Sequence, residues 1–435
     1  MTGIELGLMA LGLLVILLAL RMPIGMALIG VSFCGLWALT SWNVAWGAIG
    51  LIPHKFAANW VLSSVPMFLL LGFISYHTKL TEGLFRAAHA WMSVLPGGLA
   101  IAAILGSAGF AAVSGSSIAC SATMGRIAVP EMLKAGYHPE LATGTVAVAG
   151  TIGALIPPSI IMILYGIVAQ VPITDLFLSG IVAGALTAVG YIIVVILRVS
   201  LNPDLAPSLG ERASWAERIS SLKDTWPVIL IMLGIFTGLF GGIFTPTEAG
   251  AVGATLATLV AILKGTFTLA RFTEAIKETV LTTGSLIIIA VGASLLTRFL
   301  ALSGAGEFLS NTILSTGAGP MMIMLGVVII YLILGMFLEP IGAMLLTLPI
   351  LLPVVDGAGF SLLWFGIIVT KLLEIGMITP PIGMNVFVIK GIVGNTVSTG
   401  AIFRGIWWFL VMDIILLAIF IAFPNLITYL PSVLG

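Results

Sequence analysis

Charged residues are scarce in this chain: Lys, Arg, Asp and Glu make up 8% of its 435 residues, whereas 60% are hydrophobic. A water-soluble protein needs far more charge on its surface, so a soluble fold is excluded. The mean hydropathy of +1.23 instead indicates an integral membrane protein. Because the formal net charge is zero, a nucleic-acid partner is not expected.

Cysteine and histidine are also rare. Cys34 and Cys120 both lie in apolar segments, which gives no disulfide framework or metal cluster. The four histidines (His54, His77, His89 and His138) lie away from the serine-rich segment 114–117, so a Ser-His hydrolase is not supported. A glycine-rich phosphate loop is missing too, which excludes ATP as the energy source. We therefore expect no enzymatic activity.

The first apolar run, Leu6–Leu20, lacks the basic N-terminal region and the small-residue cleavage site of a signal peptide. We interpret it as a membrane span that is retained in the protein.

What the chain does contain is an internal repeat. Residues 130–186 and 353–409 align without a gap at an offset of 223 residues. The matched residues are mostly helix breakers, among them Pro130 with Pro353, Gly153 with Gly376, and Pro157-Pro158 with Pro380-Pro381. In an apolar chain, a repeat of this kind is typical of secondary transporters, where two broken helices meet near the membrane midplane and their freed backbone groups bind ions.

Hydropathy predicts an all-α integral membrane protein built from two repeats, 1–197 and 227–435, joined by a polar cytoplasmic linker, 198–226. The continuous spans are expected at 5–20, 24–40, 60–76, 176–197, 227–243, 247–263, 279–297 and 405–423. Each repeat also has a mixed or amphipathic segment, 79–94 in the first and 300–316 in the second, predicted to be an interfacial arm helix.

Two further segments in each repeat are irregular. Residues 98–134 and 319–355 have the pattern of re-entrant hairpins, with tips at 114–117 and near 335–340. Residues 142–168 and 363–391 are apolar helices broken at their diprolines. A hairpin returns to the side it entered, so each repeat crosses the membrane five times and the second copy is inverted.

All but three of the 17 basic residues then fall on one side of the membrane, the exceptions being Lys55, Arg298 and Lys371. This bias predicts a periplasmic location for both termini.

Each hairpin tip is expected to face its own broken helix, because the exposed carbonyl and amide groups need partners inside the membrane. Sodium ions bound by backbone carbonyls and hydroxyls would satisfy them. The first predicted sodium site consists of Ser114, Gly115, Ser116, Gly153, Ile156 and Pro158, and the second of Gly335, Met336, Gly376, Thr379 and Pro381. The alternative is that the breaks only shape helix packing.

Few ionisable residues lie deep in the apolar segments: Arg298, Glu339, Lys371, Glu374 and Asp413. Buried charge in a membrane is costly and is often functional. Lys371 and Glu374 are one helical turn apart and are expected either to neutralise each other or to act separately. Asp413 is expected to pair with a partner subunit. Arg298 either reaches the membrane surface or contacts substrate, and Glu339 lies at a hairpin tip.

Three segments, 109–117, Gly153–Ser159 and Ile378–Asn385, resemble motifs of the large membrane subunit of tripartite ATP-independent periplasmic (TRAP) transporters. The resemblance extends over the whole chain. It implies a sodium-driven elevator importer of organic acids in the bacterial inner membrane, with sodium as its only metal and no organic cofactor. It also implies a periplasmic substrate-binding protein, surrounding membrane lipids and a small four-helix membrane subunit, which we expect as a separate chain, with one copy of the large subunit per complex.

The moving elevator domain is predicted at 98–168 and 319–391, with the remainder as scaffold. Substrate contacts are predicted at Ser116, Ser117, Arg298, Glu339 and Asn385. Because Glu339 would repel a carboxylate, it favours a ligand that also carries a hydroxyl or amine. The alternatives are a stand-alone sodium/carboxylate symporter without a binding protein, a channel and an intramembrane hydrolase. The sequence does not identify which acid is carried.

Overall fold

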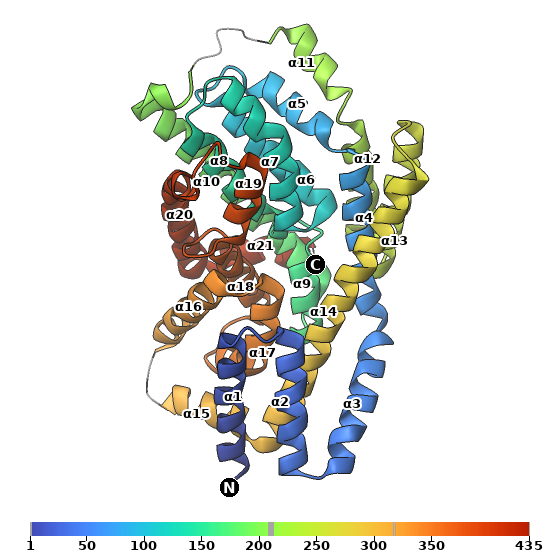
Figure 1. Ribbon diagram of the computed structural model, residues 1–435, viewed down its shortest axis with the longest axis vertical. Coiled ribbons are helices and arrows are strands. Elements are labelled where there is room, and N and C mark those ends of the chain that lie inside the picture. Colours follow the sequence, from blue (N-terminus) through green and yellow to red (C-terminus); the bar gives the residue numbers. More distant parts are fainter. Residues whose placement is uncertain (1, 208–212, 316, 318, 435) are drawn as a thin grey trace.

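The computed structural model describes residues 2–207, 213–315, 317 and 319–434. The described residues fold into α- and 3-10 helices, and no strand occurs among them. The protein is elongated, with α1–α3 at one end and α5 and α11 at the other (Figure 1). Seven helices are long and apolar enough to cross a membrane, or eight if the bent pair of α11 and α12 forms one span. The predicted all-α membrane fold is therefore confirmed.

One group of helices forms a frame along the molecule. Its members are α1 (Gly3–Ala19), α2 (Ile24–Leu39), α3 (Trp42–Ala57), α4 (Ser64–His77), α12 (Trp226–Phe240), α13 (Pro246–Leu263), α14 (Leu269–Ser303) and α15 (Ala305–Ser315). The 35-residue helix α14 runs obliquely through this frame and packs against α2 and α4 (Figure 1). Exposed apolar side chains cover much of the frame, as expected for a lipid-facing surface.

The two predicted hairpins are pairs of packed helices. In the first, α6 (Gly98–Ser114) and α7 (Ser117–Lys134) are separated by Gly115 and Ser116. In the second, α16 (Pro320–Phe337) and α17 (Pro340–Gly357) are separated by Leu338 and Glu339. Gly115 has φ of 61°, a left-handed conformation that glycine adopts without steric cost, and the Ser116 hydroxyl accepts a hydrogen bond from the Ala119 amide as α7 begins. Both tips lie where the sequence predicted them.

The broken helices follow the hairpins in each half. In the first, α8 (Pro139–Ala149) passes through a 3-10 turn, η2 (Gly150–Ala154), before α9 (Ile160–Ala169) begins. In the second, α18 (Leu362–Gly376) ends before the diproline and α19 (Met384–Val393) resumes after it. Proline lacks an amide hydrogen, so the helical hydrogen-bond ladder cannot continue through these positions.

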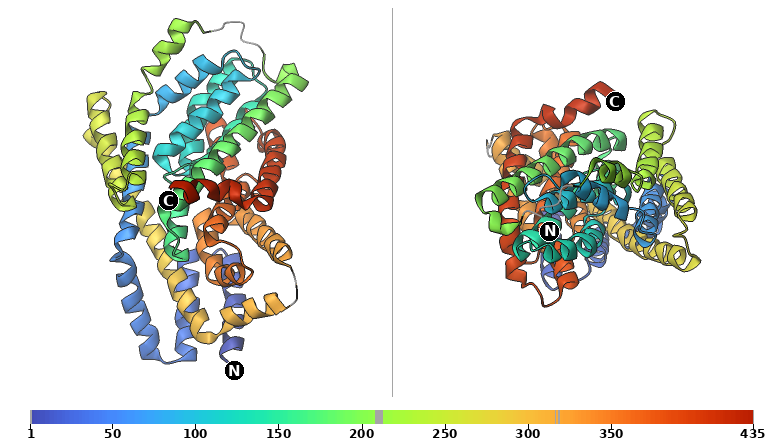
Figure 2. Two further views of the ribbon diagram at one scale, coloured as in Figure 1. Left: turned by 180° about the vertical axis from the view of Figure 1, so that it is seen from behind. Right: turned by 90° about the horizontal axis from the view of Figure 1, so that it is seen from above.

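The remaining helices are α5 (Glu82–Met92), α10 (Ile173–Leu201), α11 (Trp215–Leu222), α20 (Thr399–Ala422) and α21 (Pro424–Leu434), together with the short turns η1 (Trp60–Ser63) and η3 (Pro203–Leu205). Seen from the reverse side, α21 lies across the middle of the molecule, where it packs on α10 (Figure 2). The linker contains α11. Residues 208–212, which include Arg212 of the predicted cytoplasmic basic residues, lie outside the described part.

Several sequence expectations require correction. The helix α3 was not predicted, because Asn43, Pro53, His54 and Lys55 interrupt its apolar pattern. The predicted span 279–297 is only part of α14, which begins ten residues earlier, at Leu269. The short helix α21 was also missed.

The division into a moving domain and a scaffold stays a prediction, and the helix packing joins two further helices to the hairpins and broken helices. The helices α10 and α20, which the sequence analysis places in the scaffold, pack on α18 and on each other, and in addition α20 packs on α8 and α10 packs on α6 and α9. We therefore define the transport block as α6–α10 and α16–α20. The block meets the frame chiefly where α6 and α9 contact α4 and where α17 contacts α14 and α15.

Within the block, α8 and α20 cross at two glycines. A Cβ atom on Gly405 would lie 1.9 Å from the carbonyl oxygen of Glu140, and one on Gly144 would lie 2.6 Å from the carbonyl carbon of Gly405. The two backbones can approach this closely only without side chains at the crossing. The Gly405 carbonyl also accepts a hydrogen bond from Arg198, at 3.0 Å, which ties α10 to the same crossing.

We expect Gly405→Ala to destabilise the protein by about 1–3 kcal/mol, because the added methyl group forces two packed helices apart. Thermal unfolding of the purified protein in detergent would measure the loss. Gly326→Ala is the matched control, since this glycine lies within α16 and a methyl group added there would meet no other atom within 4 Å. The Gly326→Ala control should leave the melting temperature unchanged or raise it slightly. Equal melting temperatures for the two variants would contradict the close crossing.

Candidate functional site

The first hairpin tip is pressed against the first broken helix. A Cβ atom on Gly115 would lie 2.3 Å from the carbonyl oxygen of Pro158, and one on Gly153 would lie 3.0 Å from the carbonyl oxygen of Ser116. Backbone carbonyls from the tip and the break therefore lie side by side. The Ser114 hydroxyl is buried at the same tip and has no hydrogen-bond partner in the described structure. The structure thus brings Ser114, Gly115, Ser116, Gly153 and Pro158 together.

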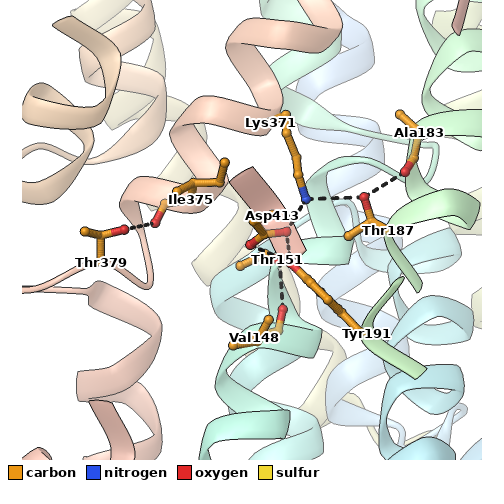
Figure 3. Close-up of polar contacts among 9 residues, drawn as sticks. All are labelled: Val148, Thr151, Ala183, Thr187, Tyr191, Lys371, Ile375, Thr379 and Asp413. Carbon is orange, nitrogen blue, oxygen red and sulfur yellow. Dashed lines mark hydrogen bonds and ion pairs between the residues drawn. The ribbon is translucent and has the colours of Figure 1, made fainter. Parts of the chain in front are cut away.

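The second hairpin meets the second broken helix at a glycine pair. A Cβ atom on Gly376 would lie 2.5 Å from the Cα atom of Gly335. Thr379 caps the end of α18 by donating a hydrogen bond to the carbonyl of Ile375, at 2.6 Å (Figure 3). Pro381 is exposed at the break, whereas Met336 is half-buried. Gly335 and Gly376 are in contact, as predicted, while the Thr379 hydroxyl is occupied by a local bond.

The two hairpin tips also meet each other. A cavity of 60 Å³ lies between them, lined by Ser116 and Ser117 from the first tip, Glu339 and Pro340 from the second, and Glu374 from α18. A second cavity of 380 Å³ shares Ser116 and Glu339 and extends to the frame, where α4 and α14 contribute Tyr76 and Glu278. The cavities join the tips to the boundary between block and frame.

Two of the predicted substrate residues lie elsewhere. Arg298 is exposed on α14 and lines neither cavity. Asn385 is fully buried in α19, where its amide donates a hydrogen bond to the carbonyl of Ala147, at 3.3 Å. Asn385 therefore connects the second broken helix to the first. Glu339 does lie at the cavity, where its carboxylate faces the amides of Ile341 and Gly342 at the start of α17.

A network of buried polar side chains lies behind the tips. The Lys371 ammonium forms an ion pair with Asp413 at 2.6 Å, and both side chains are 1% exposed. Tyr191 donates to the same carboxylate, with distances of 2.8 and 2.9 Å, and Lys371 donates to the Thr187 hydroxyl at 3.3 Å (Figure 3). The network joins α18, α20 and α10, and Thr151 of η2 lies 3.1 Å from the Tyr191 hydroxyl.

This network decides between two alternatives for Lys371 and corrects the expectation for Asp413. Lys371 pairs with Asp413 rather than with Glu374, and Asp413 has its partner within the chain rather than on another subunit. The sequence offered no signal for the pair, because the two residues lie on different helices, 42 positions apart. Glu374 instead accepts a hydrogen bond from the Ser117 hydroxyl at 2.6 Å.

A fold with two hairpins and two broken helices facing each other inside an apolar helical block defines a membrane transporter. In a solved structure, the YdaH transporter of Alcanivorax borkumensis has a similar fold, with a TM-score of 0.56 and 14% identity over 86% of this chain and 90% of that one. Residues 11–426 match the family described as tripartite ATP-independent periplasmic transporter, DctM component, and the chain belongs to this family.

Individual relatives belong to the same family. The chain is 34% identical over 378 residues to the C4-dicarboxylate TRAP transporter large permease protein DctM of Pseudomonas aeruginosa, which covers 87% of each chain. It is 30% identical over 417 residues to the sialic acid TRAP transporter large permease protein SiaM of Vibrio cholerae, which covers 96% of each. The predicted family is therefore confirmed, and the chain is a TRAP transporter large permease.

We expect Lys371→Met to cost about 3–5 kcal/mol of stability, because it leaves the Asp413 carboxylate buried without a cation. The double variant Lys371→Met/Asp413→Asn removes both charges and should recover most of the loss, since the asparagine still accepts from Tyr191. Melting temperatures of the purified proteins would provide the comparison. Additive losses in the double variant would contradict the pairing.

Proposed function

We propose that this protein is the sodium-driven permease through which a TRAP transporter imports an organic acid. The observation that carries the proposal is the contact of each hairpin tip with a broken helix, Gly115 against Pro158 and Gly335 against Gly376. At each contact, backbone carbonyl oxygens lie next to buried glycines. Sodium is a hard cation that is bound by oxygen ligands, so these are fitting positions for it.

The first sodium site would use the carbonyls of the tip and the break with the Ser114 hydroxyl, whose oxygen is buried and unpartnered in the described structure. The carbonyl oxygens of Ser116 and Pro158 lie within contact distance of the opposing glycines, Gly153 and Gly115. Gly153 and Ile156 belong to the same break. The second site would use the carbonyls around Gly335, Met336, Gly376, Thr379 and Pro381.

The organic acid would be bound between the tips, where the cavity is lined by Ser116, Ser117 and Glu339. The first turn of α7 directs free amide groups to this place, and such groups attract a carboxylate. Because Arg298 does not line this cavity, the groups among the described lining residues that could bind an anion are hydroxyls and backbone amides. Two relatives are named for C4-dicarboxylates and for sialic acid, both of them organic acids.

Transport would follow an elevator mechanism, in which the transport block slides along the frame. The block is held together by the buried ion pair Lys371–Asp413 and by the Gly144–Gly405 crossing. Its boundary with the frame contains the 380 Å³ cavity. A rigid block with a loosely filled boundary can move as a body without exposing unpaired backbone groups.

The complex would lie in the bacterial inner membrane, with both termini in the periplasm. The distribution of basic residues supports this orientation, because α5, which contains Arg86, and α11, which contains Arg218, lie at the same end of the molecule (Figure 1). The exposed apolar side chains of the frame suit a separate four-helix small subunit and lipid. A periplasmic binding protein would deliver the acid to this complex, which would contain one copy of the large subunit.

Reconstituted uptake should require a sodium gradient and should fail with potassium alone. Gly153→Leu should reduce uptake to background while the protein still folds, because its side chain would push the Ser116 carbonyl away from the break. Radiolabelled solute uptake into proteoliposomes, with the cognate binding protein present, is the measurement. Uptake driven equally by protons without sodium would refute the proposal. Unchanged uptake on omission of the binding protein would favour a stand-alone symporter.

Cysteines at Ile24 of α2 and Gly342 of α17 should crosslink in the conformation described. An added Cβ on Gly342 would lie 2.4 Å from the Ile24 side chain, so the two positions adjoin across the boundary. In a background without Cys34 and Cys120, oxidation should stop uptake and a reductant should restore it. The single cysteine variants are the controls. Full uptake by the crosslinked protein would show that the block does not move along the frame.

A further inference from the structure

The hydrogen bond between Ser117 and Glu374 connects the two halves of the chain at the place where both proposed ion sites end. Ser117 is the first residue of α7 and follows Ser116 of the first tip. Glu374 lies on α18, two residues before Gly376 of the second break. The hydroxyl donates to the carboxylate at 2.6 Å, and both residues are buried.

Glu374 is an unusual residue for a purely structural contact. It is 1% exposed, and its second carboxylate oxygen has no hydrogen-bond partner in the described structure. Lys371, one turn away, is engaged by Asp413 and Thr187. A buried carboxylate without a cation is costly, and well-packed apolar side chains would be more stable in its place. The cost indicates that the residue serves the transport process.

Glu374 also lines the small cavity between the tips, together with Glu339. It lies next to the first turn of α7, whose free amides stabilise a negative charge there. Any movement of the first tip as it closes over an ion would therefore change the position of Glu374. A shift of Glu374 in turn moves the end of α18, where Gly376 packs against Gly335 of the second tip.

We propose that the Ser117–Glu374 hydrogen bond couples the two sodium sites, so that sodium bound at one broken helix raises the sodium affinity of the other. Ser117 and Glu374 are positioning residues in this scheme, because neither belongs to either set of sodium ligands. The inference rests on the proposed sodium-driven function. Coupling between two sites is reciprocal, so loss of the bond lowers the affinity of both.

The test uses sodium itself as the probe and needs no knowledge of the carried solute. The purified complex of large and small subunits in nanodiscs is titrated with NaCl at constant ionic strength with KCl, and intrinsic tryptophan fluorescence or melting temperature reports binding. The wild type should give a Hill coefficient above 1. Ser117→Ala and Glu374→Ala should each reduce it to near 1 and raise the half-saturating sodium concentration about fivefold or more.

Three further variants separate the hydrogen bond from general damage to the fold. Ser117→Thr keeps a hydroxyl and should retain cooperativity. The double variant Ser117→Ala/Glu374→Ala should be no worse than either single variant, because both remove one interaction. Ser107→Ala is the matched control, a buried α6 serine whose hydroxyl has no partner in the described structure. It should titrate like the wild type. Melting temperatures in KCl alone show whether each variant is folded.

The outcomes distinguish this inference from the proposed function. A wild type that does not respond to sodium refutes the sodium-driven function itself. A wild type that binds sodium with a Hill coefficient of 1 leaves sodium coupling intact but overturns the coupling of the sites. Folded Ser117→Ala protein with weaker sodium binding but unchanged cooperativity also overturns it, since the bond would then support only the first site.

Discussion

The constraint on which this structure depends is that backbone amides and carbonyls inside a membrane must find partners within the protein. The segments that begin with α8 and α18 both break in the middle of apolar sequence, at their diprolines. The breaks are tolerated because a hairpin tip lies against each one. The glycines at these contacts follow from the same constraint, since Gly115, Gly153, Gly335 and Gly376 allow two backbones to come within van der Waals contact. The tips, the breaks and the small residues thus form a single arrangement.

The buried charges have a different role. Lys371 and Asp413 are placed where neither can reach water, and their pairing is completed by Tyr191 and Thr187. A buried ion pair adds little net stability, but it permits one arrangement of its helices and penalises others. It fixes α18 against α20 and α10, which explains why these last two helices belong with the transport block. Among the described residues, by contrast, the hydrogen-bond partner of Glu374 is the serine Ser117, and Glu374 lines the cavity between the tips.

The sequence predicted those parts of the fold that depend on local chemistry. Hairpin tips and helix breaks were located because glycine, serine and proline mark them and because the offset of 223 residues shows them twice. The helix α3 escaped prediction since Asn43, Pro53 and Lys55 interrupt it, although it packs against neighbouring helices of the frame. Pairings between distant helices, such as Lys371 with Asp413 and Ser117 with Glu374, leave no trace in spacing or hydropathy. The sequence left Arg298 either at the membrane surface or in contact with substrate; in the structure its side chain is exposed on α14 and lines neither of the two cavities at the tips.

The polar contacts within the transport block have a consequence for how the protein is made. Ser117 bonds to Glu374, Tyr191 to Asp413, and Asn385 to Ala147, so each contact joins the first half of the chain to the second. A ribosome delivers the first half to the membrane well before its partners exist. Until then, the hydroxyls of Ser117 and Tyr191 lack the carboxylates of Glu374 and Asp413, and the Ala147 carbonyl lacks the Asn385 amide. The polar interior of the block is therefore complete only after both halves have entered the membrane.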